Sequence, residues 1–237
     1  MKLAPVPESF IPTIAPEVFA LRPDYCALSI VARGVDNARP ASPSSVAGEQ
    51  PSVIDAIAWI DAHLESWRAA YRSFGAKPQR TPCSAEALRN RLAGGARLPS
   101  VNAVVDRYNA LSVRYGLPIG GENLNAYAGL PRLVRARGDE RFDTLKECQP
   151  ATETVPAGEV VWLDDLGVTC RRWNWRQGVR TRIEASTTDM WFVVERLEPM
   201  PLSALNEVGE QLTRALQQLS PTCQVSVVLL NRTGSHS

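Results

Sequence analysis

Apolar residues recur at intervals of three and four along several stretches of this chain, and that spacing predicts amphipathic helices. The longest such stripe precedes Gly75 and Pro78, residue types that end helices. It consists of Val53, Ile57, Ile60, Leu64, Trp67, Tyr71 and Phe74. The stripe lasts only about three heptads, which favours packing against a core over a coiled coil. Shorter patterns predict further helices over residues 84–92, 100–115 and 205–219.

Other stretches favour β-strands because they are short and rich in β-branched, aromatic or alternating apolar residues. They cover residues 25–31, 132–137, 159–164, 168–175, 190–194 and 224–230. Asp164-Asp165-Leu166-Gly167 separates two of these strands and predicts a turn, so residues 159–175 are expected to form a hairpin. Helices and strands do not alternate regularly, which indicates an α+β fold.

The chain of 237 residues is long enough to bury a substantial core, and its 44% hydrophobic content is ordinary for a globular protein. A single domain is expected over residues 18–230, between an extended, proline-rich lead-in at 1–17 and a short tail at 231–237. Within this domain, residues 34–52 are rich in Ser, Pro, Ala and Gly and predict a flexible surface loop.

The formal net charge of +1 excludes the strong overall basicity of a protein that coats DNA, so no DNA partner is expected. A local basic patch is still compatible with this charge. The longest apolar run, from Val225 to Leu230, is far too short to cross a bilayer. The first residues lack the long apolar region of a signal peptide, so a cytoplasmic location without a membrane partner is expected.

The sequence gives little support to metal or redox chemistry. Five cysteines lie far apart without a C-x-x-C pair, which indicates reduced thiols and neither a disulfide framework nor a zinc site. Of the two histidines, His236 lies in the tail and His63 has the spacing of an exposed helix residue. No metal and no cofactor are therefore expected, and a hydrolase built on histidine is disfavoured.

The segment from Cys170 to Gln177 combines three arginines with two tryptophans. Arginine offers a planar set of donors that matches phosphate, and tryptophan offers a flat face on which a base can stack. Proteins that hold single-stranded nucleic acid combine these two features. The alternative is an amphipathic strand whose tryptophans lie in the core and whose arginines are only solvated.

If this segment is a strand, its side chains alternate between two faces. The expected ligand face carries Arg172, Asn174 and Arg176. The opposite face carries Arg171, Trp173 and Trp175. At least one tryptophan is then expected in the core.

Two further features allow two interpretations each. On the helix at 100–115, Asn102, Asp106 and Asn109 share one face, where they either contact water or line a pocket. Gly120-Gly121 is either an ordinary turn or a place where the backbone approaches a ligand closely. These glycines match neither a dinucleotide-binding fingerprint nor a phosphate-binding P-loop.

Four blocks of sequence carry a family resemblance. They are Trp67-Arg68-x-x-Tyr71-Arg72-x-Phe74-Gly75-x-Lys77-Pro78, Leu98-Pro99-Ser100-Val101-Asn102-x-x-Val105-Asp106-x-Tyr108-Asn109, Arg114-Tyr115-Gly116-Leu117-Pro118-Ile119-Gly120-Gly121-Glu122-Asn123-Leu124, and Gly158-Glu159-Val160-Val161 with Cys170 to Gln177 and Thr187-Thr188-Asp189. In this order they resemble the free-standing relatives of the editing domain, the B3/B4 domain, of the phenylalanyl-tRNA synthetase β subunit. The resemblance covers roughly residues 18–196.

The resemblance implies a mixed sheet with flanking helices and an enzyme that acts in trans, hydrolysing a wrongly attached amino acid from the CCA end of tRNA. The chain departs from the synthetase domain in its pocket, because Tyr108 replaces a threonine and Gly120 replaces a histidine. A glutamate of that domain also has no counterpart near Arg180. The amino-acid specificity of the synthetase domain is therefore not carried over. A non-catalytic module that binds tRNA or a free amino acid is the alternative function.

The resemblance and the side-chain chemistry together suggest roles for individual residues. The candidate catalytic residues are Asn109 and Glu122. The candidate substrate-binding residues are Asn102, Asp106, Tyr108, Gly120, Gly121, Asn174, Thr187 and Thr188. The candidate RNA-binding residues are Arg171, Arg172, Trp175 and Arg176. The expected partner is the aminoacylated CCA end of a tRNA.

Overall fold

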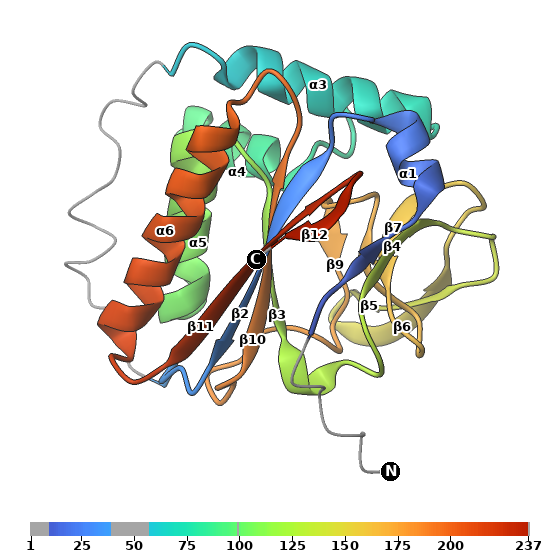
Figure 1. Ribbon diagram of the computed structural model, residues 1–237. Helices are drawn as coiled ribbons and strands as arrows, with labels where there is room; N and C mark the ends of the chain where they lie inside the picture. The colour runs from blue at the N-terminus through green and yellow to red at the C-terminus, as the bar shows by residue number, and fades with distance from the viewer. Residues whose placement is uncertain (1–9, 39–56, 99, 237) are drawn as a thin grey trace.

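Two β-sheets and five α-helices make up the part of the chain that the computed structural model describes, residues 10–38, 57–98 and 100–236. The two sheets lie side by side, with helices against the outer face of one sheet and a long helix across the top of the view in Figure 1. This architecture confirms the α+β class that the irregular order of helices and strands predicts.

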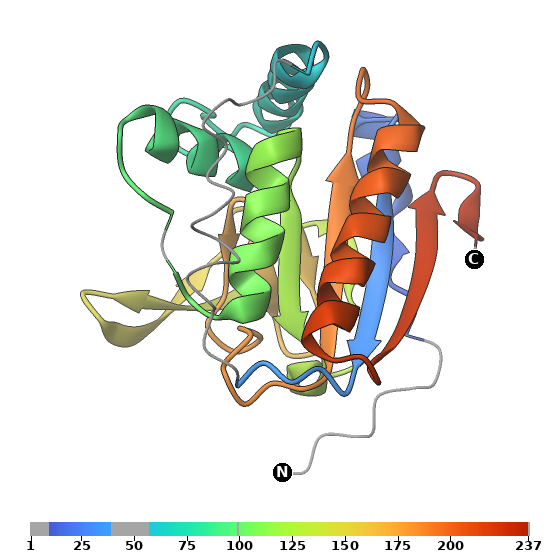
Figure 2. The same cartoon turned by 90° about the vertical axis from the view of Figure 1, so that its left-hand side faces the viewer.

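The first sheet is antiparallel, with the strand order β12-β11-β2-β10-β3. Its strands are β2 (Cys26–Arg33), β3 (Ile119–Asn123), β10 (Met190–Arg196), β11 (Gln224–Asn231) and β12 (Gly234–His236). Helices α5 (Ala103–Tyr115) and α6 (Leu202–Leu219) cover one face of this sheet (Figure 2). An apolar core that includes Ile30, Phe192 and Leu212 lies between the sheet and these helices. Strand β3 forms one edge of the sheet, so half of its backbone groups face away from β10.

The second sheet is mixed, because β1 pairs with β4 and β5 pairs with β8 in parallel, whereas its other pairs are antiparallel. Its strand order is β1-β4-β7-β8-β5-β6, and β9 also pairs with β8. The strands are β1 (Thr13–Ile14), β4 (Arg132–Arg135), β5 (Arg141–Lys146), β6 (Gln149–Thr154), β7 (Val160–Leu163), β8 (Val168–Arg171) and β9 (Arg176–Gln177). The mixed sheet that the family resemblance implies is thus present, but it is accompanied by a second, antiparallel sheet.

A second apolar core fills the space between the two sheets and is rich in tryptophan. Four of its tryptophans are at most 1% exposed: Trp67, Trp162, Trp173 and Trp191. Helices α1 (Pro16–Leu21), α3 (Ile60–Ser73) and α4 (Ser84–Ala93) contribute residues to this core. Side chains of β10 alternate between the two cores, with Phe192 in the first and Trp191 and Val193 in the second.

The expected hairpin at 159–175 is confirmed in its first part, where β7 pairs with β8. The prediction of one continuous strand over 168–175 is wrong. β8 ends at Arg171, and the next four residues form a turn before β9 begins. Within this turn, Arg172 and Trp173 have left-handed backbone angles, with φ of 47° and 66°. Because these residues are not in a strand, the expected alternation of Arg172, Asn174 and Arg176 on one ligand face does not hold.

His63 is also placed differently from the expectation, because its side chain is fully buried. Its Nδ1 lies 2.9 Å from the carbonyl oxygen of Gly116, and its Nε2 accepts hydrogen bonds from Trp67 Nε1 and the backbone N–H of Leu197. Burial lowers the pKa of His63 to about 4, so the ring is neutral at neutral pH. This histidine joins α3 to two distant segments and has a structural role.

The terminal segments and the expected surface loop can be followed only in part. Residues 1–9 and 39–56, with most of the expected loop at 34–52, lie outside the described residues. At the start of that loop, Val35 and Asn37 are buried, and Asn37 bonds the backbones of Glu184 and Val104. The expected lead-in carries the short strand β1, and residues 234–236 of the expected tail form β12.

Replacement of Trp173 tests its place in the core between the sheets. Its ring makes edge contacts with Tyr25 and Trp67 at centroid distances of 5.1 and 5.5 Å. We expect Trp173→Ala to lower the free energy of unfolding by about 3–5 kcal/mol, because it leaves a large cavity. Urea unfolding followed by circular dichroism measures this change. Trp175→Ala is the control, and it should cost clearly less because Trp175 is half-buried.

Candidate functional site

A cavity of about 280 Å³ lies beside the edge strand β3. Its walls come from α4, α5, β3, β10 and the 172–175 turn, so it lies where the helices meet both sheets. Several residues singled out from the sequence line it: Tyr108, Asn109, Gly120, Gly121, Glu122, Asn174 and Trp175. The cavity also includes Ser84, Cys170, Gln177 and Glu195, which were not among the candidate site residues.

The two glycines of β3 present different backbone groups. The N–H of Glu195 donates to the carbonyl of Pro118, so alternation along the ladder directs Gly120 toward β10 and Gly121 toward the free edge. Accordingly, the Gly121 carbonyl accepts a hydrogen bond of 3.0 Å from Gln177 Nε2. A Cβ atom at Gly121 would lie 2.8 Å from Tyr108 Cε1, so a side chain there would displace the tyrosine. The interpretation of these glycines as an ordinary turn is wrong, since both lie within a strand.

Glu195 is a fully buried carboxylate in the wall of the cavity. Its Oε1 accepts hydrogen bonds from Tyr25 Oη at 2.7 Å and Trp162 Nε1 at 3.4 Å, and its Oε2 accepts one from Asn174 Nδ2 at 2.8 Å. Tyr71 donates to the Asn174 carbonyl oxygen and fixes the orientation of that amide. Burial raises the pKa of Glu195 from an ordinary value of 4.5 to about 7, although the hydrogen bonds from Tyr25 and Asn174 act in the opposite direction.

Glu122 is the second buried carboxylate of the cavity. It accepts a short hydrogen bond from Tyr127 Oη, whose ring packs against Trp191. Burial raises the pKa of Glu122 from 4.5 to about 7, with partial compensation from Tyr127 and from the charge of Arg180. Near neutral pH each carboxyl group can therefore hold or release a proton, as a group involved in acid–base catalysis must.

Three polar groups of the cavity have no hydrogen-bond partner among the residues that the structure describes. Two of them are buried, Ser84 Oγ and Trp173 Nε1. The third is the side-chain amide of Asn109, which is half-buried in the cavity wall. Polar atoms inside a protein are usually hydrogen-bonded, so these groups are suited to a bound ligand or water.

Four of the candidate substrate-binding residues lie outside this cavity. Asn102 is the N-cap of α5 and accepts from the Val105 N–H at 3.0 Å. Asp106 accepts from the Ser100 hydroxyl and the Val101 N–H, so it holds the segment before the helix. The hydroxyls of Thr187 and Thr188 are likewise not part of the lining; Thr187 Oγ1 accepts from the Glu184 N–H. The polar face of α5 therefore combines two structural residues with one cavity residue, Asn109.

The candidate RNA-binding residues separate into two groups. Arg171 is buried and forms ion pairs with Glu153 at 2.7 Å and Glu159 at 2.9 Å, so it cannot bind a ligand without breaking them. Arg172 instead lies over the ring of Trp175, with its Cζ 4.3 Å from the ring centroid. Arg176 is half-buried, 5.9 Å from the same ring, and donates to the carbonyl of Leu145.

Glu195 is the main cavity residue that the sequence analysis missed. Its signal was a carboxylate directly after the apolar stretch from Met190 to Val194. By strand alternation it shares a face with Trp191 and Val193, which places a charged group on a buried face. That conflict between pattern and charge marks a functional residue or a buried network.

The described residues were also searched for membrane-spanning helices and for groups of metal-binding side chains. No helix in the described ranges combines the length and apolar character needed to cross a membrane. Within the same ranges, no group of three or more His, Cys, Asp or Glu side chains is placed to hold a metal ion.

Comparison with known families places this α+β chain in one of them. The B3/4 domain family matches residues 66–216, and the chain belongs to this family. Among solved structures, the chain is similar to an N-terminal fragment of the phenylalanyl-tRNA synthetase β subunit from Pyrococcus horikoshii, with 11% identity and a TM-score of 0.48. That alignment covers 95% of this chain and 53% of the other, so the chain spans about half the length of that fragment. A search of curated proteins finds no match.

The two buried carboxylates predict a specific dependence of stability on pH. Both have a higher pKa in the folded protein than the ordinary value of 4.5, so folding favours their protonated forms. Their contribution to the free energy of unfolding is fully present below pH 4.5 and is lost as pH rises toward and through about 7. We expect a loss of up to about 3 kcal/mol per group over this window. His63 acts in the opposite direction, because its contribution is lost as pH falls from 6.5 toward about 4.

Urea unfolding from pH 4 to pH 8 separates these effects. As pH rises, the free energy of unfolding of the wild type should fall relative to that of Glu122→Gln and of Glu195→Gln. Glu210→Gln is the control, because Glu210 is exposed on α6 and its substitution should leave the pH profile unchanged. Parallel profiles for wild type and both cavity variants would mean that the carboxylates ionise normally.

Proposed function

We propose that this chain is an aminoacyl-tRNA deacylase that acts in trans and hydrolyses the ester of a mischarged amino acid at the CCA end. The observation that carries this proposal is a cavity of about 280 Å³ that holds two buried carboxylates, an outward-facing glycine N–H and a free asparagine amide. An aminoacyl ester presents an ammonium group, a carbonyl and an attacking water, and each of these finds a complementary group in the cavity. Membership of the B3/4 domain family supports the same reading.

Glu195 is suited to the α-ammonium group of the substrate. Three donors already orient its carboxylate, from Tyr25, Trp162 and Asn174. A cation placed beside it favours the ionised form, so substrate binding would lower the pKa of Glu195 from about 7 and create an ion pair in a site of low dielectric constant. The substrate would thereby be fixed by its charged end, which holds the ester in one place.

The reaction itself needs a proton acceptor and a polarised carbonyl. Glu122, with a pKa raised to about 7, can accept a proton from the attacking water at neutral pH. Asn109 can orient that water or the ester, because its amide has no partner among the described residues. Of the two glycines of β3, only Gly121 directs its N–H to the free edge, where it can polarise the ester carbonyl; the N–H of Gly120 belongs to the ladder with β10. The ribose hydroxyl beside the ester can further assist.

The terminal nucleotides of the tRNA would bind at the 172–175 turn. Trp175 lines the cavity, so its ring can stack on the terminal adenine while Arg172 covers part of the ring. Arg176, half-buried and outside any ion pair with a described residue, can contact phosphate. Arg171 is removed from the set of RNA-binding candidates because its charge is already matched by Glu153 and Glu159.

The competing function is a non-catalytic module that binds tRNA or a free amino acid. It is supported by Gly120, which occupies the position of a histidine in the synthetase domain that the sequence resembles. The two functions make opposite predictions for turnover. Tight binding of tRNA without release of an amino acid from any mischarged tRNA would establish the module and exclude the deacylase.

A panel of tRNAs mischarged with different amino acids tests the deacylase directly. We expect release of at least one amino acid, and this release should survive EDTA. Asn109→Ala and Glu122→Gln should each reduce kcat/KM on the order of tenfold to a thousandfold, because they remove groups that act on the ester or the water. The matched controls are Asn125→Ala and Glu210→Gln, at exposed positions outside the cavity, which should retain wild-type rates.

The pH dependence of the same reaction reports the protonation state of Glu122. As a base it must be ionised, so kcat at saturating substrate, where the bound ammonium group already keeps Glu195 ionised, should rise with pH and level off above about 7. Glu122→Gln should remove this rise in whatever activity remains. A tRNA whose terminal ribose lacks the hydroxyl next to the ester should resist hydrolysis. A profile that is flat in the wild type, or unchanged in Glu122→Gln, would exclude Glu122 as the base.

A further inference from the structure

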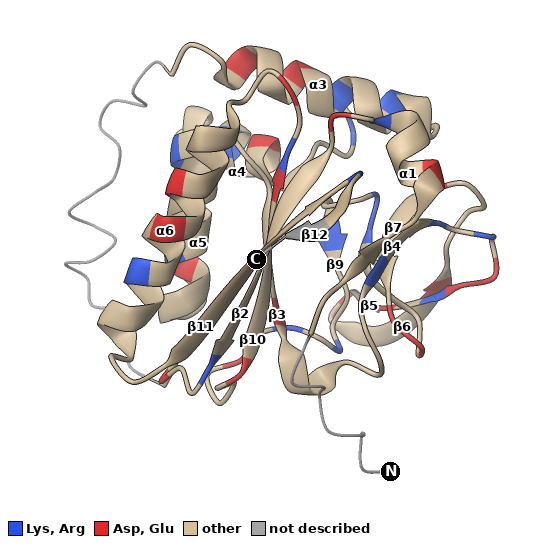
Figure 3. Cartoon of the chain, in the orientation of Figure 1, with Lys and Arg blue, Asp and Glu red and all other residues tan. Residues whose placement is uncertain are grey.

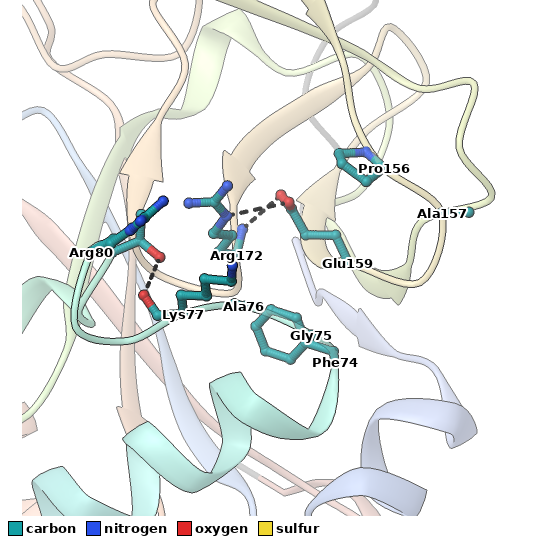
Figure 4. Close-up of a pocket in the computed structure, with 10 residues that line it drawn as sticks. Phe74, Gly75, Ala76, Lys77, Arg80, Pro156, Ala157, Glu159 and Arg172 are labelled. Carbon is teal, nitrogen blue, oxygen red and sulfur yellow. Dashed lines mark hydrogen bonds and ion pairs between the residues drawn. The ribbon is translucent and has the colours of Figure 1, made fainter.

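A second pocket, of about 300 Å³, shares the 172–175 turn with the cavity. It lies between the segment that follows α3 and the segment around Pro156 and Ala157 (Figure 4). Its lining contains three basic side chains, Lys77, Arg80 and Arg172, and one carboxylate, Glu159. Figure 4 shows the three basic residues on one side of the pocket, with Pro156 and Ala157 on the other. We refer to this site as the basic pocket.

Two of the basic side chains come from one turn. The backbone N–H groups of Arg80 and Thr81 both donate to the carbonyl of Lys77, and this holds Lys77 and Arg80 in a fixed relation. Both side chains are exposed, and neither forms an ion pair with a residue that the structure describes. The turn begins at Lys77, within the first of the four sequence blocks, and this lysine has no role in the chemistry proposed so far.

The third basic side chain is held in place by its neighbours. Glu159 accepts from the backbone N–H of Arg172 at 3.2 Å and lies 3.5 Å from its Nε. The other side of the guanidinium stacks on Trp175. Glu159 does not cancel the basic charge, because it already forms a two-point ion pair with Arg171, through Nε and Nη2, each at 2.9 Å. The Nη groups of Arg172 are therefore oriented and available to an anion.

The shared turn relates the two pockets in space. Arg172 lines the basic pocket, whereas Asn174 and Trp175 line the cavity. Only Trp173 lies between Arg172 and Asn174 in the chain, so the Cα atoms of these two residues lie within about 7 Å of each other. In RNA, the 5′-phosphate and the 3′-ester of a terminal nucleotide lie on opposite sides of one ribose. A ligand with an ester in the cavity thus brings a phosphate close to Arg172.

We propose that the basic pocket binds the phosphate that joins the terminal adenosine of the CCA end to the preceding nucleotide, through Lys77, Arg80 and Arg172. This proposal rests on the proposed function for the choice of RNA as partner. It adds a site for one particular phosphate, and two residues, Lys77 and Arg80, to the RNA contacts of that function. Along α6, by contrast, charges of both signs are mixed, which is typical of a solvated face (Figure 3).

A binding cycle with uncharged RNA tests the phosphate site without any hydrolysis. The probe is an RNA hairpin ending in CCA, compared with the same hairpin carrying a neutral methylphosphonate at the last linkage. The protein variant is Lys77→Gln with Arg80→Gln. Wild type should bind the methylphosphonate hairpin on the order of tenfold more weakly, whereas the double variant, which keeps only Arg172, should show a clearly smaller difference between the two hairpins. The salt slope of the double variant should also be smaller by roughly 0.7 for the lost phosphate contact.

Two controls show whether the effect is local. Arg214→Gln with Arg232→Gln removes the same charge from exposed positions on α6 and after β11, and it should retain the wild-type preference. A methylphosphonate placed in the stem of the hairpin should affect wild type and the Lys77/Arg80 variant equally. Thermal unfolding confirms that both double variants are folded.

The outcomes separate this proposal from the deacylase. If wild type does not distinguish the two hairpins, or if the Lys77/Arg80 variant distinguishes them as wild type does, the phosphate site is wrong. The phosphate site is also wrong if wild type does not bind the hairpin at all. In that case an acidic protein surface would be the better ligand for the basic pocket. If the cycle shows the expected coupling but no mischarged tRNA is hydrolysed, the phosphate site stands and the deacylase falls.

Discussion

Burial of Trp173 between the two sheets is the interaction on which the candidate site depends. The turn that carries it contains two residues with left-handed backbone angles, a conformation that non-glycine residues adopt at a cost of about 1–3 kcal/mol each. The tryptophan compensates, since its ring is fully buried and its backbone N–H donates to the carbonyl of Val160. As a result Arg172, Asn174 and Trp175 are held in fixed directions, the first into the basic pocket and the others into the cavity.

The two buried carboxylates of the cavity destabilise the folded protein when they are ionised, and hydrogen bonds from the rest of the fold reduce this cost. Glu195 receives hydrogen bonds from residues that are far away in sequence, and Tyr25 is separated from it by 170 positions. Such bonds only partly offset the loss of hydration, and the pKa of each carboxyl group therefore rises to about 7. A purely structural core would be better served by apolar side chains. These carboxylates, together with Ser84 and Asn109, which have no hydrogen-bond partner in the described part of the chain, are consistent with a cavity that is completed by a ligand.

The polar face of α5 illustrates why residue type and spacing alone cannot assign a role. Asn102 and Asp106 satisfy backbone N–H groups at the start of the helix, whereas Asn109, two turns further on, reaches the cavity. All three have short polar side chains on one face. Asn102 and Asp106 lie near the first turn, where every helix has unpaired N–H groups that their side chains can bind. Asn109 lies beyond that turn, where the N–H groups are already paired.

The sequence by itself determined the elements and the class of the fold, because hydrophobic periodicity reports which face of a helix or strand is buried. The helix around Trp67, the strand from Met190 and the hairpin of β7 and β8 follow from such patterns. The choice of Glu122 and Asn109, which line the cavity, came instead from the family resemblance and the chemistry of their side chains. Only the tertiary structure decided that Arg171 is an ion-pair residue, that His63 is a buried link and that Glu195 enters the cavity. Their surroundings are supplied by segments distant in sequence, and local periodicity carries no information about such partners.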